Sequence, residues 1–318
     1  MSFIHDDPDF VQVLRLVSAE TRIDPSLVEK DYWVTHCMWA LHQTGLELWF
    51  KGGTSLSKGY GIIQRFSEDL DLMVQHGTAV GLPSVSNWSS VNKGPIAARR
   101  AFYAALPGVF CIPSVKVEID EKTQDKHARG INLVGRYPGV LLDQLSPTMS
   151  PYVFFEIGRA RVVPFADKPL SSFVHDWLQQ RDQLGNYTDN RPRSVRCVHP
   201  LVTLIEKLDA LSRRYAREKL EPDGFVRHYE DAAHIIRSLS SLPPVEQSPR
   251  ALADEMLGAK NLAAIPIADE HALILDDGAR RSAVKQALAR IHGMFWGPRI
   301  PVDEACATIR AWVRGNLE

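Results

Sequence analysis

The sequence predicts an α+β fold, in which a mixed sheet with helices is followed by a helical domain. The first evidence is the stretch Phe50–Val74, which has the pattern of a strand end, a glycine turn, a helix and a second strand. Three more alternating segments follow, at residues 114–120, 129–137 and 151–162. From Leu201 onward the apolar residues recur at helical spacing. The polar stretch Leu184–Ser194 separates the two patterns, so we expect domains over residues 1–195 and 196–318.

Helices are expected on both sides of these strands. Asp7 and Pro8 have the chemistry of a helix start, and Asp24 and Pro25 repeat it before a helix that ends at Gly45. The other expected elements are helices at residues 97–106 and 171–183, an edge strand at 195–200, helices at 201–211, 225–239, 251–257 and 284–295, and a final helix. The chain therefore alternates between strands and helices first and becomes wholly helical later.

Composition limits the class of protein. Of the 318 residues, 45% are hydrophobic and 24% are charged, which is ordinary for a globular protein. The net charge of −1 argues against a globally basic nucleic-acid binder but permits a local basic patch. The four cysteines form no C-x-x-C pair, so neither a zinc site nor a disulfide framework is expected. We expect a cytoplasmic protein, because no signal peptide is recognisable and no run reaches the roughly 20 apolar residues of a membrane span.

A glycine pair follows the first expected strand. Gly52 and Gly53 let the backbone turn sharply and come close to a ligand. Thr54 and Ser55 can cap the next helix, whose free amide groups then face whatever lies at the turn. Because a helix N-terminus with hydroxyl groups binds anions, these four residues predict a phosphate site.

Two carboxylates follow on the next expected strand. Asp69 and Asp71 are two residues apart, so they project from one face while Leu70 and Leu72 pack on the other. Two adjacent carboxylates repel each other unless a cation lies between them, and hard oxygen ligands suit Mg²⁺. A phosphate site facing such a pair suits phosphoryl or nucleotidyl transfer. The spacing of a Walker A loop is absent.

The whole run FKGGTSLSKGYGIIQRFSEDLDL resembles the signature of polymerase-β-like nucleotidyltransferases, which place G-G or G-S before a helix and D-x-D after it. In detail it is similar to the AbiEii/AbiGii toxin family, the toxin half of bacterial abortive-infection and toxin–antitoxin pairs. A K-D-Y-W-V segment at Lys30–Val34 adds to the resemblance, and Lys30 is assigned no catalytic role. The resemblance implies a polymerase-β-like domain, an NTP substrate, bound Mg²⁺ and an active site between the two domains.

A third metal-binding carboxylate is also implied by the resemblance. Glu156 lies in the middle of an apolar strand, where an acidic residue is costly unless it is paired or metal-bound. The family pattern has a similar strand here, so Glu156 is the preferred partner of Asp69 and Asp71. Glu118, in the segment KVEID, is the alternative.

Three residues of the helical half complete the implied site. Lys207 and Arg214 are seven apart on one helix face, a spacing that by itself is typical of a solvated flank. The resemblance implies that Lys207 neutralises charge on the triphosphate and that Arg214 binds the nucleotide beside it. Asp231 follows Arg227 by four residues, so the two can pair along a helix. The resemblance gives Asp231 a role in activity, either orienting Lys207 or acting as a base toward the acceptor hydroxyl.

The acceptor is inferred from the family, several members of which are thought to modify the 3′ end of tRNA and so block translation. A 3′ hydroxyl of RNA would then attack the α-phosphorus in line, and pyrophosphate would leave. Basic clusters that could serve RNA are Arg191, Arg193 and Arg196, and then Arg213, Arg214, Arg217 and Lys219. A cognate antitoxin is the other implied partner. Two rivals remain, namely nucleotidylation of a protein or a small molecule, and an NTP-binding module without turnover.

Overall fold

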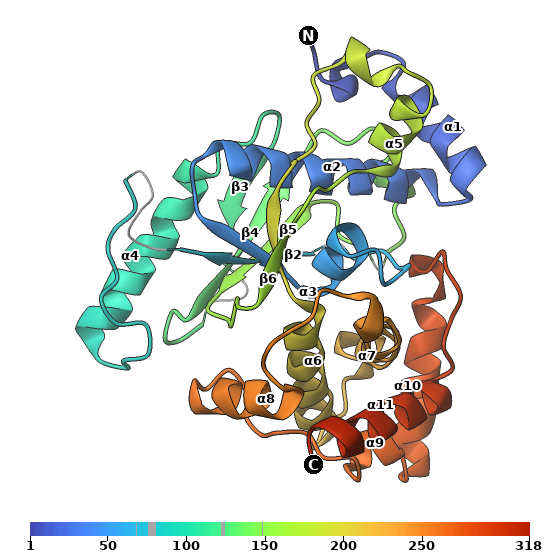
Figure 1. Ribbon diagram of the computed structural model, residues 1–318. Helices are drawn as coiled ribbons and strands as arrows, with labels where there is room; N and C mark the ends of the chain where they lie inside the picture. The colour runs from blue at the N-terminus through green and yellow to red at the C-terminus, as the bar shows by residue number, and fades with distance from the viewer. Residues whose placement is uncertain (68, 76–80, 122–124, 148) are drawn as a thin grey trace. The chain divides into compact units, whose positions relative to one another are not determined.

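The computed structural model describes residues 1–67, 69–75, 81–121, 125–147 and 149–318 (Figure 1). Within these ranges the fold is mixed α/β, with a seven-stranded mixed sheet and many helices. The chain divides into two compact units. Unit 1 comprises Met1–Gly59, Phe66–Arg159 and Ala166–Cys197, and unit 2 comprises Tyr60–Arg65, Ala160–Phe165 and Val198–Glu318.

The sheet has the strand order β3-β4-β5-β2-β1-β7-β6. Its strands are β1 (Leu48–Lys51), β2 (Asp69–Val74), β3 (Lys116–Ile119), β4 (Gly130–Arg136), β5 (Val153–Gly158), β6 (Phe165–Lys168) and β7 (Val195–Val198). β2 runs antiparallel to β1 and parallel to β5, while β4 pairs antiparallel with both β3 and β5. The strands expected at 114–120, 129–137 and 151–162 are therefore confirmed as β3, β4 and β5, and the third of them lies inside the sheet.

One strand prediction was wrong in position and one strand was missed. β7 was expected at the edge, but it lies between β1 and β6. The edge strand beside β7 is β6 (sequence FADK), which has four residues. These four residues do not alternate between apolar and polar, so the sequence pattern did not reveal the strand.

The two faces of the sheet differ in polarity. Leu70, Leu72 and Phe155 are fully buried on one face, as the alternation along β2 predicts. Phe110, at the end of α4 (Lys93–Val109), packs edge-on against Phe155 with ring centroids 5.7 Å apart. Helix α4 therefore covers the apolar face, and the opposite face carries the polar residues of β2.

Helix α2 (Pro25–Gln43) is mostly buried within unit 1 and packs against α1 (Phe10–Thr21) and α5 (Phe173–Gln179). Its start is as predicted, because Asp24 accepts a 2.9 Å hydrogen bond from the Ser26 amide next to Pro25. Asp31 forms a 2.6 Å ion pair with Lys58, and Lys30 donates to the Ser150 carbonyl. The K-D-Y-W-V segment therefore connects α2 to distant parts of unit 1.

A buried hydrogen-bond network fastens the stretch at 184–194 to these helices. The Asn190 amide donates to Tyr32 at 3.0 Å and to His36 at 2.8 Å, and its oxygen accepts from His175 at 2.7 Å. Tyr32 in turn donates to the Nδ1 of His5 at 2.7 Å. Burial lowers the pKa of His5 and that of His175 to about 4, so both rings are neutral at pH 7.

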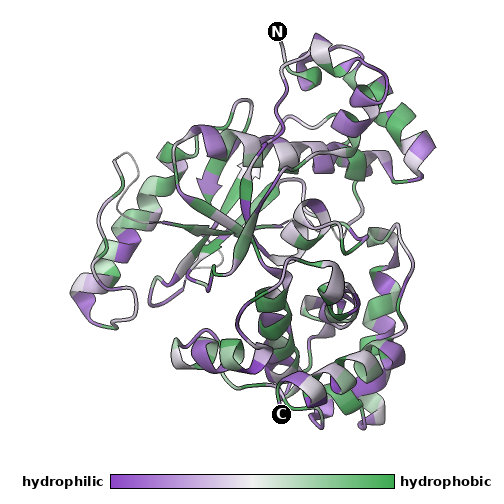
Figure 2. Cartoon of the chain, viewed as in Figure 1, coloured by the Kyte–Doolittle hydropathy of each residue, from purple (hydrophilic) through white to green (hydrophobic). Residues whose placement is uncertain are grey.

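Unit 2 is helical. Its helices are α6 (Pro200–Tyr215), α7 (Arg227–Ser238), α8 (Pro249–Gly258), α9 (His271–Ile274), α10 (Gly278–Arg290) and α11 (Val302–Asn316). α7 packs against both α6 and α11. The predicted helices are confirmed, except that α10 ends before Phe295 and the short α9 was not expected. Hydrophobic and hydrophilic residues are interspersed along these helices (Figure 2), and α6 and α7 are clearly amphipathic.

None of the helices in the described ranges combines the length and the apolar composition that a membrane crossing needs.

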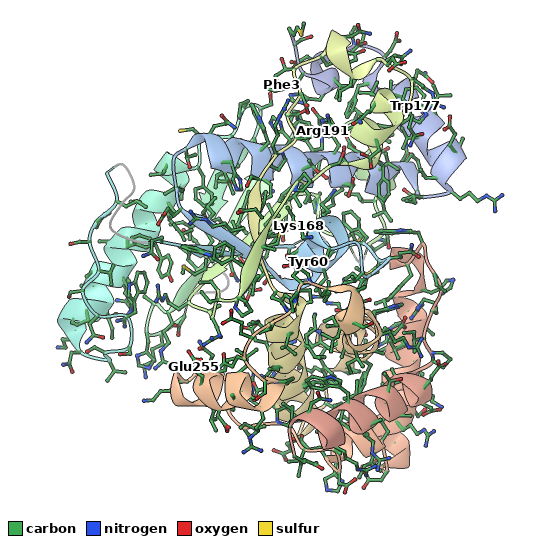
Figure 3. The ribbon with its side chains drawn as sticks, in the orientation of Figure 1. Phe3, Tyr60, Lys168, Trp177, Arg191 and Glu255 are labelled. Atoms are coloured by element: carbon green, nitrogen blue, oxygen red, sulfur yellow. The ribbon has the colours of Figure 1, made fainter. Side chains whose placement is uncertain are left out.

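A segment from the middle of the glycine–D-x-D run belongs to unit 2. This segment, Tyr60–Arg65, is called the strap here; Figure 3 labels its first residue, Tyr60. The Gln64 carbonyl accepts hydrogen bonds from the amides of Trp296 and Gly297, at 3.1 and 3.3 Å, and Arg65 forms a β-bridge with Phe295. A Cβ atom at Gly297 would lie 2.0 Å from the Gln64 side chain, so this close approach needs glycine. The strap is thereby fixed to unit 2 through its backbone.

Candidate active site

The glycine turn lies directly against a carboxylate of the D-x-D motif. Gly52 has φ +73°, and a Cβ atom there would lie 1.7 Å from the Oδ2 of Asp71. Only glycine meets both conditions. The chain passes from β1 into the helical turns α3 (Gly52–Thr54) and η2 (Ser55–Gly59), which confirms the predicted order of strand, glycine turn and helix.

The expected capping by Thr54 and Ser55 is wrong. The helical turn begins two residues earlier, at Gly52, and its N-cap residue is Lys51 without a side-chain cap. The positive φ of Gly52 lets the chain enter the helix directly after the strand, so Thr54 and Ser55 lie inside it and are buried. The Thr54 hydroxyl donates instead to the backbone carbonyls of Asp69, at 2.6 Å, and of Ser67, at 3.1 Å. Thr54 therefore links the glycine turn to the start of β2.

A row of polar residues crosses the open face of the sheet. Asp71 lies opposite Lys51 on β1 and opposite Glu156 on β5, and Glu156 lies opposite Asn132 on β4. Residues paired across strands project from the same face, so these four side chains share one face. Asp69 projects from that face too, because it lies two residues from Asp71 on β2.

The register favours Glu156 over Glu118 as the third carboxylate. Glu156 is exposed on the strand next to β2, so it does not bear the desolvation cost expected of an acid in an apolar strand. Glu118 lies on β3, with β4 and β5 between it and β2. Its carboxylate pairs with Lys116 at 2.5 Å and with Arg136 at 3.3 Å, and these partners lower the pKa of Glu118. Glu118 is therefore engaged at the sheet edge.

The donor set on this face fits a hard divalent cation. Asp69, Asp71 and Glu156 offer carboxylate oxygens from two adjacent strands, which is the chemistry that Mg²⁺ prefers. Among the residues that the structure describes, no group of three or more acidic, histidine or cysteine side chains is already gathered around a common metal position.

In unit 2, Lys207 of α6 and Asp231 of α7 form a buried ion pair, with Nζ 2.8 Å from Oδ2. Arg65 of the strap binds the same carboxylate with two hydrogen bonds, from Nε at 2.7 Å and from Nη2 at 2.8 Å. Arg65 was not identified from the sequence, because a partner 166 positions away leaves no periodic signal. The side chains of Arg65, Lys207 and Asp231 are 2%, 8% and 1% exposed.

The electrostatics of this cluster favour one of the two roles expected for Asp231. Burial alone would raise the pKa of Asp231, but Arg65 and Lys207 together hold it well below its ordinary value. A carboxylate this acidic is a poor proton acceptor at neutral pH. Asp231 is therefore better suited to orienting Lys207 than to acting as a base.

The surroundings of Lys207 are positive. The Nδ1 of His228 lies 3.4 Å from the Lys207 Nζ. Burial, and then the charge of Lys207, lower the pKa of His228 well below its ordinary value, with smaller contributions from Arg227 and Arg214. His228 is thus neutral, and Lys207, Arg227 and Arg214 place positive charge near it. Such a cluster suits an anionic ligand. Arg214 also donates a 2.5 Å hydrogen bond to the Gly224 carbonyl, which ties it to the loop before α7.

The basic clusters expected to serve RNA are largely balanced by nearby acids. The ion pairs are Arg191 and Arg193 with Asp189, Arg196 with Glu47, Arg213 with Asp209, and Lys219 with Glu221. The positive surface is therefore weaker than the count of arginines and lysines implied.

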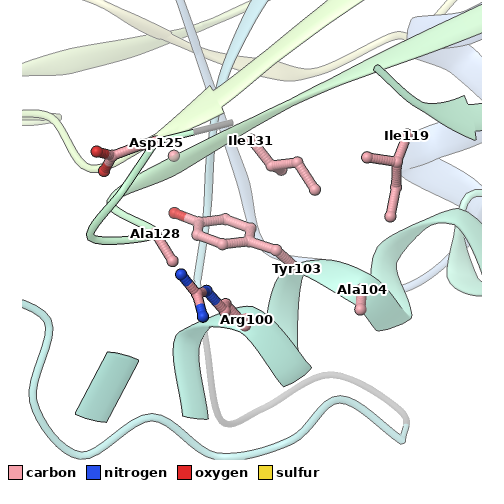
Figure 4. Close-up of a pocket in the computed structure, with 8 residues that line it drawn as sticks. Arg100, Tyr103, Ala104, Ile119, Asp125, Ala128 and Ile131 are labelled. Atoms are coloured by element: carbon pink, nitrogen blue, oxygen red, sulfur yellow. The ribbon is translucent and has the colours of Figure 1, made fainter. Parts of the chain in front are cut away.

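A pocket near α4 lies away from the carboxylate row. Arg100 and Tyr103 of α4 line it together with Ile119, Asp125 and Ile131 (Figure 4). Ile131 lies opposite Ile157, which is buried on the apolar face of the sheet. This pocket therefore opens beside the face that α4 covers and not beside Asp71.

Comparison with known proteins identifies the family of this chain. A family model described as "Nucleotidyl transferase AbiEii toxin, Type IV TA system" matches residues 37–307, a range that includes the glycine turn, the carboxylate row, Lys207 and Asp231. Neither a curated protein nor a solved structure gives a match. Nucleotidyltransferases generally use a divalent metal, and a toxin–antitoxin family implies an NTP substrate and an antitoxin partner. The chain belongs to the AbiEii family of nucleotidyltransferase toxins of type IV toxin–antitoxin systems.

Proposed function

We propose that this toxin is a Mg²⁺-dependent nucleotidyltransferase that moves an NMP unit from an NTP to the 3′ end of tRNA and thereby blocks translation. The observation that carries the proposal is Asp71, which contacts the Gly52 turn on one side and faces Glu156 on the other. This arrangement places carboxylates beside a backbone turn where phosphates can approach. Residues 1–195 would form the nucleotidyltransferase domain, and residues 196–318 would supply Lys207 and Asp231.

The carboxylate row would hold the metal. Asp69, Asp71 and Glu156 are the proposed ligands, since they share the open face of the sheet. A divalent ion bound there would neutralise negative charge on the phosphates and on the oxygens that attack and leave. Gly52 and Gly53 bring the first amides of a helical turn to this face, and such amides have no partner within the helix, so they can donate to phosphate oxygens.

The cations of unit 2 would bind the leaving part of the nucleotide. Lys207 donates to the triphosphate, and Arg214 adds positive charge from the same helix. Asp231 holds the Lys207 ammonium in one orientation. A hydroxyl of the acceptor attacks the α-phosphorus, the bond from the α-phosphorus to the bridging oxygen breaks, and pyrophosphate leaves.

The test is label transfer. The purified protein is incubated with total tRNA, Mg²⁺ and each α-³²P-labelled NTP in turn, and Asp71→Asn, Glu156→Gln and Glu118→Gln are assayed beside it. We expect label on tRNA with one NTP, lost in Asp71→Asn and Glu156→Gln and retained in Glu118→Gln. No label on tRNA with any NTP, despite measurable NTP binding, would refute transfer to tRNA and would favour a regulatory NTP-binding module.

One observation favours a second class of acceptor. Because nearby acids balance most of the expected basic residues, the chain has a weaker electrostatic footprint for RNA than its sequence suggested. Transfer of the NMP to a protein or a small molecule would use the same carboxylates and cations. Label on protein and none on tRNA, in an assay that contains both, would establish this alternative.

A further inference from the structure

The strap carries one side chain into the positive cluster of unit 2. Arg65 is 2% exposed and is the last residue of the strap, whose backbone is fixed on the side of Phe295 and Trp296. Asp69 follows four residues later, and the Thr54 hydroxyl holds the Asp69 carbonyl at 2.6 Å. The strap and Asp69 are thus each held by hydrogen bonds to their own unit.

The arrangement around Asp231 is a shared carboxylate. Arg65 occupies both oxygens of Asp231 with its planar guanidinium, and Lys207 binds Oδ2 from another direction. A bidentate guanidinium fixes the plane of the carboxylate as well as its position. Arg65 therefore sets the direction of the Oδ2 lone pair that accepts the hydrogen bond from Lys207. In this way Arg65 orients the lysine ammonium indirectly, through Asp231.

Charge reinforces this coupling. Arg65 and Lys207 are both cations, and both bind the Asp231 carboxylate in a desolvated position. The positive charge of Arg65 also acts on Lys207 directly, because it lowers the pKa of the lysine, although burial has the larger effect.

We propose that Arg65 is a positioning residue for nucleotidyl transfer, since its bidentate bond to Asp231 fixes the carboxylate that orients Lys207. This inference rests on the proposed function, in which Lys207 binds the triphosphate. Arg65 itself touches neither substrate nor metal in this account. A purely structural role for Arg65 would stabilise the fold without acting on Lys207.

The chain offers a matched control on the same helix. Glu230, next to Asp231 on α7, is 1% exposed and accepts three hydrogen bonds from the Arg299 guanidinium. They run from Nε to Oε1 at 3.0 Å and to Oε2 at 2.9 Å, and from Nη2 to Oε1 at 2.5 Å. Arg299→Met and Arg65→Met each remove the bidentate partner of a buried carboxylate on α7. Both substitutions should lower the stability of the protein. Only the substitution of Arg65 should change the orientation and the pKa of Lys207.

The experiment measures kcat for label transfer and the pH dependence of Lys207 in the wild type and both variants. The second readout is acetylation of the Lys207 amine across pH, resolved by peptide mass spectrometry, with Lys207→Arg identifying the peptide. For Arg65→Met we expect kcat to fall roughly 10- to 100-fold, since misplacement by about 1 Å can cost that much. We also expect the acetylation midpoint of Lys207 to move to higher pH, because a neighbouring positive charge is gone. Arg299→Met should leave both values close to those of the wild type.

Two results would overturn the proposal. One is an acetylation midpoint in Arg65→Met that equals that of the wild type, and the other is an equal loss of kcat in Arg65→Met and Arg299→Met. If Arg65→Met does not fold, Arg65→Lys is tested instead. Lysine keeps the positive charge but cannot make the two parallel hydrogen bonds of a guanidinium. It should lower kcat with little change in the midpoint, and wild-type kcat would contradict the proposal. A wild type that transfers no nucleotide refutes the proposed function, whereas the acetylation readout still decides the coupling of Arg65 to Lys207.

Discussion

Replacing Gly52 with alanine should abolish most activity at a moderate cost in stability. The residue has φ +73°, and its new Cβ atom would lie 1.7 Å from the Oδ2 of Asp71 and 2.5 Å from Cγ. The left-handed backbone costs about 1 kcal/mol for alanine. Forcing the Asp71 side chain off its rotamer adds about 1 kcal/mol. Because the carboxylate must move by about 1 Å or more, we expect transfer to fall about 100-fold.

Gly45→Ala is the matched control, because Gly45 has φ +74° and nothing lies within 4 Å of the added Cβ. The control bears the same backbone strain without the contact to Asp71. Urea unfolding should show a loss of about 1 kcal/mol for Gly45→Ala and about 2 kcal/mol for Gly52→Ala. Label transfer should be unchanged in Gly45→Ala. Equal activity in the two variants would show that the approach of Gly52 to Asp71 does not matter for the reaction.

Three further predictions concern the buried polar groups. Asp231→Asn should destabilise the protein by about 3–5 kcal/mol in urea unfolding, because two buried cations lose their counter-ion; a loss below about 1 kcal/mol would contradict the buried cluster. The pKa values of His5 and His175 are about 4 in the fold, against 6.5 as the ordinary value, so the unfolded chain binds their protons first as the pH falls. Stability should therefore decrease between pH 6.5 and 4, by up to about 3 kcal/mol for each ring, and an unfolding free energy that is flat over this window would disprove the neutral network. Thr54→Val should cost about 1–3 kcal/mol, because the hydrogen bond to the Asp69 carbonyl is lost, and a thermal melt identical to that of the wild type would argue against that link.

Local chemistry predicted most of the elements. Asp24 and Pro25 marked the start of α2, and the alternation around Leu70 and Leu72 marked β2, because both signals depend on residues only a few positions apart. β6 was not predicted because its four residues, FADK, show no alternation of apolar and polar residues. The capping by Thr54 and Ser55 was wrong because the helix started at Gly52, where a positive φ replaced the usual cap.

The sequence predicted individual residues of the site but not the contacts between residues that are distant along the chain. The period of a strand placed Asp69 and Asp71 on one face, but only the register between β2 and β5 shows that Glu156 faces Asp71. Arg65 is the clearest omission, because its partner Asp231 is 166 positions away and no spacing rule joins them. Sequence patterns describe neighbours along the chain, whereas ion pairs of this kind depend on tertiary packing.

The basic residues show the opposite error. Arg196 and Arg213 stand out in the sequence as positive charges, yet each lies beside an acid in the fold, Glu47 and Asp209 respectively. A count of charges over a short window misses acids that approach from elsewhere. Whether the surface is positive enough to bind RNA can therefore be judged only from the folded structure.

Pyrophosphate release is the most direct test of the central claim, that Asp71 and the carboxylates on the same face of the sheet support nucleotidyl transfer. The wild type and Asp71→Asn are incubated with the four NTPs, a desalted cell extract as a source of RNA and protein acceptors, and increasing Mg²⁺. The account predicts release that depends on Mg²⁺ and extract in the wild type and is lost in Asp71→Asn, with Glu118→Gln resembling the wild type. Equal release by the wild type and Asp71→Asn would contradict it.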